Sequence, residues 1–499
     1  MSHKAGHDPR AAALSVLMAV VHGNEDSQAA LNKVLNREGF SIAPSDKGLC
    51  TELVYGVLRQ YVRLEAFVLG FLSRPDKLPD EMRLLLLQTL YEMAFLRVPH
   101  HAGVNWAVGH VRNRFGKGLA SVTNGVLRSM QRGLREFLYD GDEKERCVDA
   151  QSLARRYGAP LWLAQLWHGA YGADDCEKLL RAALSAPPSG IRLNRARPDW
   201  EARRAALVQQ PLAVEEKIPG KAPGKTPEKA PEEEMAEPAT APHSGPLAVG
   251  PAGLAYFAAL PWAVKDMLKK GAASRQSVAS YEALEVLLPA TWPRPVWDCC
   301  AGRGGKSLPL LEQGLAVGLA SDISAARLKG FAQEYTRLEL TEPPCPALCL
   351  LDASDIDARP LLMGEIQHET KTPPNLDKKA DMATALLPEA FATILIDAPC
   401  SGLGTLARRP EIKLRRSPKD LENLAGLQAR ILEAAWQRLE PGGCIVYLTC
   451  TLNPAENQGQ IARFLAEHPS ARLHTEYTTP FDAPFGEFFY AARVDKARL

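Results

Sequence analysis

The chain has 499 residues, 46% of them hydrophobic and 23% charged, with a formal net charge of only +1. This length predicts two or three domains, and ten cysteines are too few for a disulfide scaffold. The near-zero charge excludes a globally basic protein, so any surface that binds nucleic acid has to be local.

The sequence carries no signal-peptide pattern and no apolar run of membrane length. It therefore predicts a cytoplasmic, monomeric protein with reduced thiols and no membrane partner. Cys345 and Cys349 are spaced like a pair of metal ligands, but no second pair or nearby histidine completes a site, so no metal is expected.

Residues 1–145 are predicted to form an all-helical domain. Apolar residues recur at helical spacing in 11–21, 51–72, 81–96 and 104–114. Ser45 or Asp46 is the expected N-cap after the break at Pro44. Seven arginines on helix-like sequence form either solvated helix faces or a surface that contacts RNA phosphates. They are Arg59, Arg63, Arg112, Arg114, Arg128, Arg132 and Arg135.

The order of these elements resembles the NusB-type RNA-binding helical domain. The residues that carry the resemblance are Arg10-Ala11-Ala12-Ala13, Ser45-Asp46-Lys47-Gly48, residues 52–59, the helix at 84–96 and residues 123–128. The resemblance spans about 130 positions and implies RNA as a partner.

Residues 146–213 are predicted to form a small connecting subdomain that binds RNA. A helix opens near Tyr157, and a strand follows at Ile191-Arg192-Leu193-Asn194. Arg192 and Asn194 are expected either to touch the RNA backbone or to serve surface or turn chemistry. Residues 214–246 are rich in Lys, Pro, Glu and Ala without apolar periodicity, which predicts a disordered linker.

Residues 247–499 alternate strand-like and helix-like sequence, which predicts a Rossmann-like α/β domain with a doubly wound sheet. Five apolar runs are the expected strands: 296–298, 316–321, 346–351, 392–396 and 444–448. Residues 357–388 interrupt this pattern and are predicted to be a mobile insertion.

A glycine-containing loop at 298–307 follows the first of these strands. Glycines allow a ligand to approach the backbone, and the helix that follows offers free N–H groups. Four strands end in an acid, Asp298, Asp322, Asp352 and Asp397. Asp322 is expected to hold ribose hydroxyls and Asp352 an adenine amino group. Adenosine recognition without a phosphate motif predicts S-adenosylmethionine.

Two cysteines stand at the ends of two other strands. Cys400 lies in Asp397-Ala398-Pro399-Cys400-Ser401, after 392–396, and Cys450 closes 444–448. A lone buried cysteine is usually a small core residue. Two thiols at the carboxyl ends of strands in one sheet are instead expected to face one pocket. Lys306 and Lys413 are expected to lower a thiol pKa there.

The stretch 271–491 resembles the RsmB (Sun/Fmu) type of RNA cytosine-5 methyltransferase, and the whole chain has that type's layout. The matching pieces are Gln276, Ala279-Ser280, the loop 298–307, Asp322, Asp352, residues 397–405 (DAPCSGLGT), 408–413, Thr449-Cys450, Glu456-Asn457 and 486–491.

The resemblance implies methylation of carbon 5 of a cytosine, with 16S rRNA as the expected substrate. Cys450 would be the nucleophile, Cys400 would assist product release and Asp397 would bond the cytosine edge. Lys306 would hold the cofactor carboxylate or position Asp397. The implied cofactor-binding residues are Cys300, Ala301, Gly302, Arg303, Gly304, Gly305, Lys306, Asp322, Asp352 and Asp397.

Two positions depart from the family pattern: Gly302-Arg303 replaces the usual Ala-Pro, and Thr451 replaces the commoner serine. Two alternatives stay open. One is a tRNA or DNA cytosine methyltransferase; DNA enzymes use the Pro-Cys cysteine as nucleophile, so replacing Cys400 or Cys450 separates them. The other is a non-catalytic RNA-binding or antitermination factor.

Overall fold

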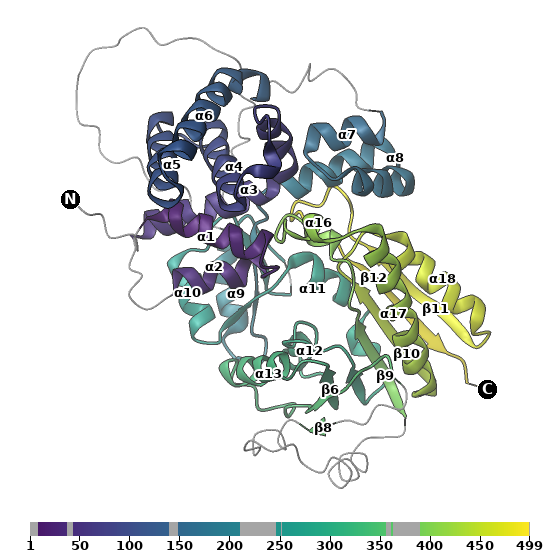
Figure 1. Ribbon diagram of the computed structural model, residues 1–499. Helices are drawn as coiled ribbons and strands as arrows, with labels where there is room; N and C mark the ends of the chain where they lie inside the picture. The colour runs from purple at the N-terminus through teal and green to yellow at the C-terminus, as the bar shows by residue number, and fades with distance from the viewer. Residues whose placement is uncertain are drawn as a thin grey trace, which may run out of the picture.

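The computed structural model describes residues 8–36, 43–138, 148–209, 246–250, 252–355, 361–362 and 390–498. Apart from residue 246, the predicted linker 214–246 lies outside these ranges. The predicted insertion 357–388 also lies outside them, except for the short strand β8 (Leu361–Leu362). The described residues form a helical part and a sheet-containing part, stacked one above the other in Figure 1.

Six helices build the N-terminal helical domain: α1 (Pro9–Val21), α2 (Ser27–Leu35), α3 (Pro44–Leu69), α4 (Asp80–Phe95), α5 (His100–Phe115) and α6 (Lys117–Leu138). Their apolar faces share one core, with Leu17, Leu58 and Leu85 fully buried. The predicted N-cap was wrong: α3 begins at Pro44 with Ala43 as its cap residue. Proline fits there because the first helical N–H has no partner in the helix.

The connecting region continues with α7 (Ala150–Tyr157), α8 (Leu161–Leu184) and α9 (Trp200–Gln209). A small antiparallel sheet with strand order β2-β3-β1-β4 includes β1, which lies between α8 and α9, and three strands that follow α9. Its strands are β1 (Ser189–Leu193), β2 (Ala248–Val249), β3 (Leu254–Phe257) and β4 (Ala273–Arg275), and α10 (Trp262–Lys269) precedes β4.

The sheet domain is organised around eight strands in the order β11-β12-β10-β9-β5-β6-β7-β8. The parallel centre consists of β5 (Val296–Asp298), β6 (Leu319–Asp322), β7 (Ala347–Leu350), β9 (Phe391–Asp397) and β10 (Leu439–Thr449). The strand order reverses between β5 and β9, which is the switch point where open α/β sheets bind ligands. The edge strands β8 and β11 (Ala471–Thr478), and β12 (Tyr490–Lys496) between β11 and β10, pair antiparallel.

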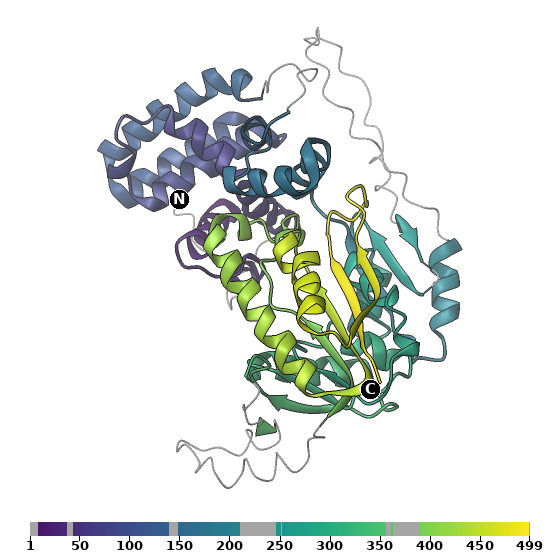
Figure 2. The ribbon, with the colours of Figure 1, turned by 90° about the vertical axis from the view of Figure 1, so that its right-hand side faces the viewer.

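Helices cover both faces of this sheet (Figure 2). The five are α11 (Val278–Glu285), α12 (Ser307–Glu312) and α13 (Ala325–Arg337) on one face, and α17 (Pro418–Gln437) and α18 (Gln458–Glu467) on the other. Leu395 faces the first group and Ile394 the second, so β9 is apolar on both sides. Within the described ranges, no helix is long and apolar enough to cross a membrane.

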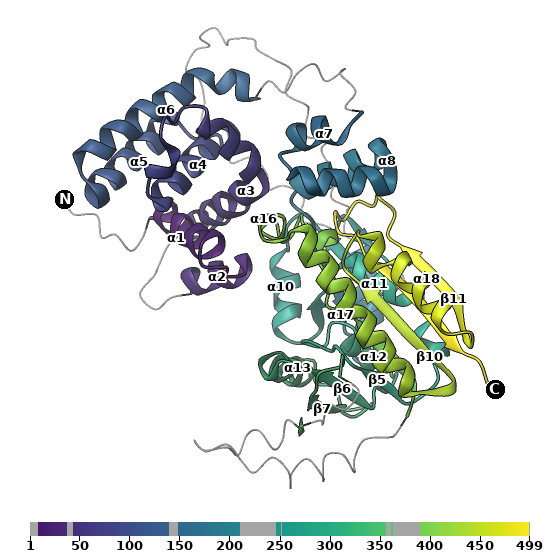
Figure 3. The same cartoon turned by 45° about the vertical axis from the view of Figure 1, so that its right-hand side comes forward.

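The helical domain lies against the short helix α16 (Ile412–Arg415) of the sheet domain, as Figure 3 shows. Arg59 of α3 donates to the carbonyl of Ala407 at 3.1 Å, and Lys413 donates back to the carbonyl of Arg59 at 2.5 Å. Arg415 donates to the carbonyl of Val20 at 2.7 Å. The segment that follows the Cys400 loop is therefore anchored on the helical domain.

Candidate active site

The two predicted thiols meet at the carboxyl ends of β9 and β10. The sulfur atoms of Cys400 and Cys450 are 3.2 Å apart although 50 positions separate them, and both side chains are partly exposed. The N–H of Cys450 also donates to the Cys400 sulfur at 3.3 Å. Gly404 allows this approach, because a Cβ there would lie 2.9 Å from the carbonyl oxygen of Cys450 and 2.1 Å from that of Phe488.

The pair is chemically asymmetric. The hydrogen bond from the Cys400 thiol lowers the pKa of Cys450, and the positive charge of Lys306 lowers it further. The same sulfur–sulfur hydrogen bond, with burial, raises the pKa of Cys400 well above its ordinary value. Because the thiolate is the nucleophilic form of cysteine, this asymmetry favours Cys450 as the nucleophile.

Lys306 and Asp397 form an ion pair at the same edge of the sheet. The Lys306 ammonium is buried and donates to Asp397 Oδ2 at 2.9 Å. Of the two roles expected for Lys306, this contact matches the positioning of Asp397. The expectation for Lys413 was wrong, because its ammonium bonds to the carbonyls of Arg59 and Gly158 rather than lying beside the thiols.

A buried carboxylate joins the two cysteine loops. Glu456 is 0% exposed, and its two oxygens accept from the N–H and hydroxyl of Ser401, the residue after Cys400, at 2.8 and 2.6 Å. The Ser401 oxygen also lies 2.6 Å from the hydroxyl of Thr451, the residue after Cys450. Gln428 and Asn453 donate to the same carboxylate, each at 3.0 Å.

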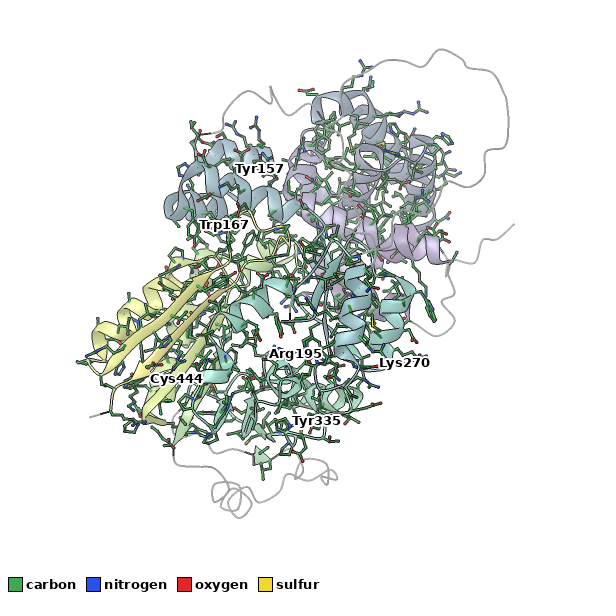
Figure 4. The ribbon with its side chains drawn as sticks, turned by 180° about the vertical axis from the view of Figure 1, so that it is seen from behind. Tyr157, Trp167, Arg195, Lys270, Tyr335 and Cys444 are labelled. Carbon is green, nitrogen blue, oxygen red and sulfur yellow. The ribbon has the colours of Figure 1, made fainter. Side chains whose placement is uncertain are left out.

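The helical part also holds the Cys450 loop. Trp167 of α8 donates its indole N–H to the carbonyl of Leu452 at 3.1 Å, two residues after Cys450. Figure 4 shows Trp167 where α8 meets the sheet domain. Residues of the helical part therefore contact both the Cys450 loop and the segment that follows the Cys400 loop.

The glycine loop packs against the end of β6. Gly302 and Gly304 have φ of +56° and +85°, a region in which residues with a Cβ are strained. The N–H of Gly302 donates to Asp322 Oδ2 at 3.0 Å, and that of Ser324 to Asp322 Oδ1 at 2.8 Å. Asp352 is exposed and accepts from the N–H and hydroxyl of Ser354 in a turn.

Asp298 supplies the test of whether a cofactor fits this loop. It is 0% exposed, and one carboxylate oxygen accepts from Ser307 at 2.5 Å while the other has no hydrogen-bond partner within the described residues. Burial raises the pKa of Asp298 to about 7. An unpartnered acceptor beside open glycine backbone suits a ligand with a cationic amino group, and S-adenosylmethionine carries one.

The remaining predicted cofactor residues lie in the same loop. The N–H of Ala301 donates to the carbonyl of Ser321 at 2.8 Å, and Cys300 Sγ lies 3.9 Å from Cys299 Sγ. The side chain of Arg303 leaves the loop and lies against Gly330 of α13, so only its backbone remains beside the cofactor site. Within the described ranges, no group of three His, Cys, Asp or Glu side chains is placed to hold a metal.

Four residues for which RNA contact was one of two predicted roles form contacts within the protein instead. Arg192 is buried and forms a two-bond ion pair with Glu312 at 2.7 and 2.9 Å, and Asn194 is buried and donates to two main-chain carbonyls. Arg59 bonds to the sheet domain, and Arg63 donates to the carbonyl of Phe137. The other five arginines, on α5 and α6, are exposed.

Glu456 belongs to a sequence motif that predicted no role for it, and no motif pointed to Gln428. The sequence signal for Glu456 is its place six residues after Cys450, in the pair Glu456-Asn457. The spacing could not show that its partner is Ser401, which is 55 positions earlier.

Comparison with known proteins places both parts of the chain. A model of the NusB family matches residues 7–132, and a model described as 16S rRNA methyltransferase RsmB/F matches residues 286–489. Ribosomal RNA small subunit methyltransferase B of Vibrio cholerae is 31% identical over 93% of this chain and 90% of its own length. The probable enzyme of the same name from Bacillus subtilis is also 31% identical, over 89% and 86%.

The fold has a close counterpart among solved structures. The structure described as "Crystal Structure of PH0851" superposes with a TM-score of 0.62 over 99% of this chain and all of that chain, at 19% identity. At this identity the likeness supports the fold alone, a helical domain joined to a Rossmann-like sheet domain.

Proposed function

Since the chain belongs to the ribosomal RNA small subunit methyltransferase B family, whose members methylate RNA with S-adenosylmethionine, we propose that it methylates carbon 5 of a cytosine in 16S rRNA. The observation that carries this proposal is the contact of 3.2 Å between Cys400 and Cys450, with the pKa of Cys450 lowered. Two thiols in contact fit a reaction that must form and then break a bond to the base.

Cys450 begins the proposed reaction. Carbon 5 of cytosine is a weak nucleophile, and addition of the Cys450 thiolate to carbon 6 makes carbon 5 enamine-like. Asp397, fixed by Lys306, is placed at the edge of the same pocket to bond the polar edge of the base. A base inside a stacked helix cannot reach such a pocket, so the target is an unstacked or looped nucleotide.

The cofactor, when bound, supplies an electrophilic methyl group on a sulfonium. The residues that would hold it are the backbone of 300–306, Asp322, Asp352 and the free oxygen of Asp298. After methylation, carbon 5 carries both the methyl group and its original proton. Transfer of that proton to a base such as water leaves its electron pair to regenerate the carbon 5–carbon 6 double bond. The carbon 6–sulfur bond breaks in the same step and returns its electron pair to Cys450. Cys400 is the group in contact with that sulfur and assists this release.

Methyl transfer from labelled S-adenosylmethionine to protein-free 16S rRNA tests this proposal. Wild type should label cytosine, Cys450→Ala should be inactive, and Cys400→Ala should accumulate a covalent protein–RNA adduct that migrates slowly on a denaturing gel. The buried, unreactive Cys176→Ala is the matched control and should behave as wild type. Methyl transfer by Cys450→Ala would refute the assignment of the nucleophile.

The substrate is tested by the same assay with tRNA in place of rRNA. Labelling of tRNA alone would replace the 16S rRNA assignment while leaving the two-thiol reaction in place. If wild type neither binds S-adenosylmethionine nor labels any RNA, the chain is an RNA-binding factor without activity.

A further inference from the structure

A cavity of about 390 Å³ lies beside the glycine loop, bounded by β4 of the small sheet and by α13. Gly304 and Gly305 line one side of it, and Arg275, at the end of β4, lines another. Neither the thiol pair nor any of the four strand-end acids belongs to its lining. The cavity is therefore adjacent to the cofactor loop and separate from the proposed reaction centre.

The lining of this cavity carries an excess of positive charge. Four arginines line it, and two of them are neutralised: Arg192 by Glu312 and Arg337 by Glu334, each at 2.7 Å. The other two, Arg275 and Arg303, are exposed, and no ion pair to either is present in the described part of the chain. Two guanidinium groups without a carboxylate thus face a concave surface.

The Arg303 guanidinium lies against the backbone of α13. A Cβ built on Gly330 of α13 would lie 2.7 Å from the central carbon of the Arg303 guanidinium and 2.8 Å from one of its nitrogens. The guanidinium therefore rests on the helix backbone, at a position that only glycine leaves open. A planar guanidinium presents its N–H donors as a fork that matches the oxygens of a phosphate.

We propose that Arg275 and Arg303 form a phosphate-binding site that holds a backbone phosphodiester of the RNA substrate. This inference rests on the proposed function for its ligand. Arginine forks bind phosphate oxygens with two parallel hydrogen bonds, and backbone phosphate contacts fix the register of a nucleic acid on a protein. Arg303 is three residues from Lys306, so at most about 11 Å separates the Cα atoms of these two residues.

Binding of the full-length protein to a fluorescent fragment of 16S rRNA, without cofactor and at 50 to 300 mM salt, tests the site. Each neutralised phosphate contact contributes about 0.7 to 0.9 to the slope of log K against log salt. Arg303→Ala and Arg275→Ala should each weaken binding about threefold to tenfold and reduce the slope by about one. Arg430→Ala, which removes an exposed arginine from α17, is the matched control and should change neither.

Gly330→Ala tests whether the position of the Arg303 guanidinium matters apart from the net charge of the protein. Alanine is the better helix former, so the variant should fold, but its methyl group displaces the Arg303 guanidinium. It should weaken RNA binding in the same direction as Arg303→Ala, although no charge is removed. Arg303→Lys should restore part of the salt slope.

Three results would overturn the inference: an unchanged salt slope in both arginine variants, an equal loss of binding in Arg430→Ala, or a loss of cofactor binding by Arg303→Ala with RNA binding unchanged. The third would assign the guanidinium to the cofactor carboxylate. The proposed function fails by a different result, which is a wild-type protein that binds RNA but labels no cytosine.

Discussion

Replacing Glu456 by glutamine tests whether one buried carboxylate holds the two thiols together. The Glu456 carboxylate accepts four hydrogen bonds at 2.6 to 3.0 Å, two on each oxygen. An amide group in the same place turns an NH₂ toward two of these donors. The Ser401 hydroxyl can reorient to accept from it, but at least one other buried N–H loses its acceptor.

The cost of this substitution follows from those contacts. A buried donor without an acceptor costs about 1–3 kcal/mol, and a hydrogen bond weakens by about 1 kcal/mol when its acceptor loses its charge. We therefore expect Glu456→Gln to lower the free energy of unfolding by about 2–4 kcal/mol. For a domain of this size, each kcal/mol lowers the melting temperature by about 2–4 °C.

Two measurements on the same samples check the prediction. Thermal unfolding followed by circular dichroism reports the loss of stability. Iodoacetamide labelling read by peptide mass spectrometry reports the thiol pair, where wild type should label Cys450 faster than Cys400 and Glu456→Gln should lose that preference. Glu433→Gln on α17 is the control, because its half-exposed carboxylate bonds to Gln437 and His468 and to no other side chain of the described residues. This substitution should change stability by less than about 0.5 kcal/mol. Wild-type stability together with a wild-type labelling ratio would refute the bracing role of Glu456.

Two further predictions concern buried lysines. Lys306→Met removes a positive charge that lowers the pKa of Cys450, so the pH profile of Cys450 alkylation should move to higher pH; an unmoved profile, with exposed Lys419→Met as control, would contradict this. Burial lowers the pKa of Lys413 from 10.5 to about 7, so between these values the unfolded chain binds one more proton than the folded protein. The free energy of unfolding of wild type should therefore rise, relative to that of Lys413→Met, by up to about 1.4 kcal/mol per pH unit above pH 7. A difference in melting temperature between the two proteins that stays constant from pH 7 to 9.5 would refute this prediction.

Local patterns in the sequence predicted the sheet and its loops well. The strand at 296–298 was predicted within its observed bounds, and the runs 392–396 and 444–448 lie inside β9 and β10. Each is buried on both faces, so its apolar run is a property of adjacent residues. The proximity of Cys400 and Cys450 followed from the same logic, since the carboxyl ends of neighbouring parallel strands meet at one edge.

Contacts between distant segments were beyond local patterns. Arg192 reads as a polar residue on a short strand, and nothing near it in the sequence indicates its partner Glu312, 120 positions later. The same holds for Asn194 and for Arg59, whose partners lie in other domains or elements. The local sequence around a charged residue is the same whether the side chain contacts solvent, RNA or a buried partner. Which of these it contacts is determined by tertiary packing.

The contacts of α16 have a consequence for how the two domains can diverge. Lys413 and Arg415 reach across to carbonyl oxygens of the backbone, at Arg59, Gly158 and Val20, rather than to side chains. Every amino acid supplies that carbonyl, so substitutions on the opposing helices preserve the acceptors as long as the helices keep their paths. The bonds from Lys413 and Arg415 are thus tolerant of substitutions on the helical side and sensitive to changes of those two side chains. The bonds that Arg59 and Trp167 donate to the sheet domain depend instead on side chains of the helical part.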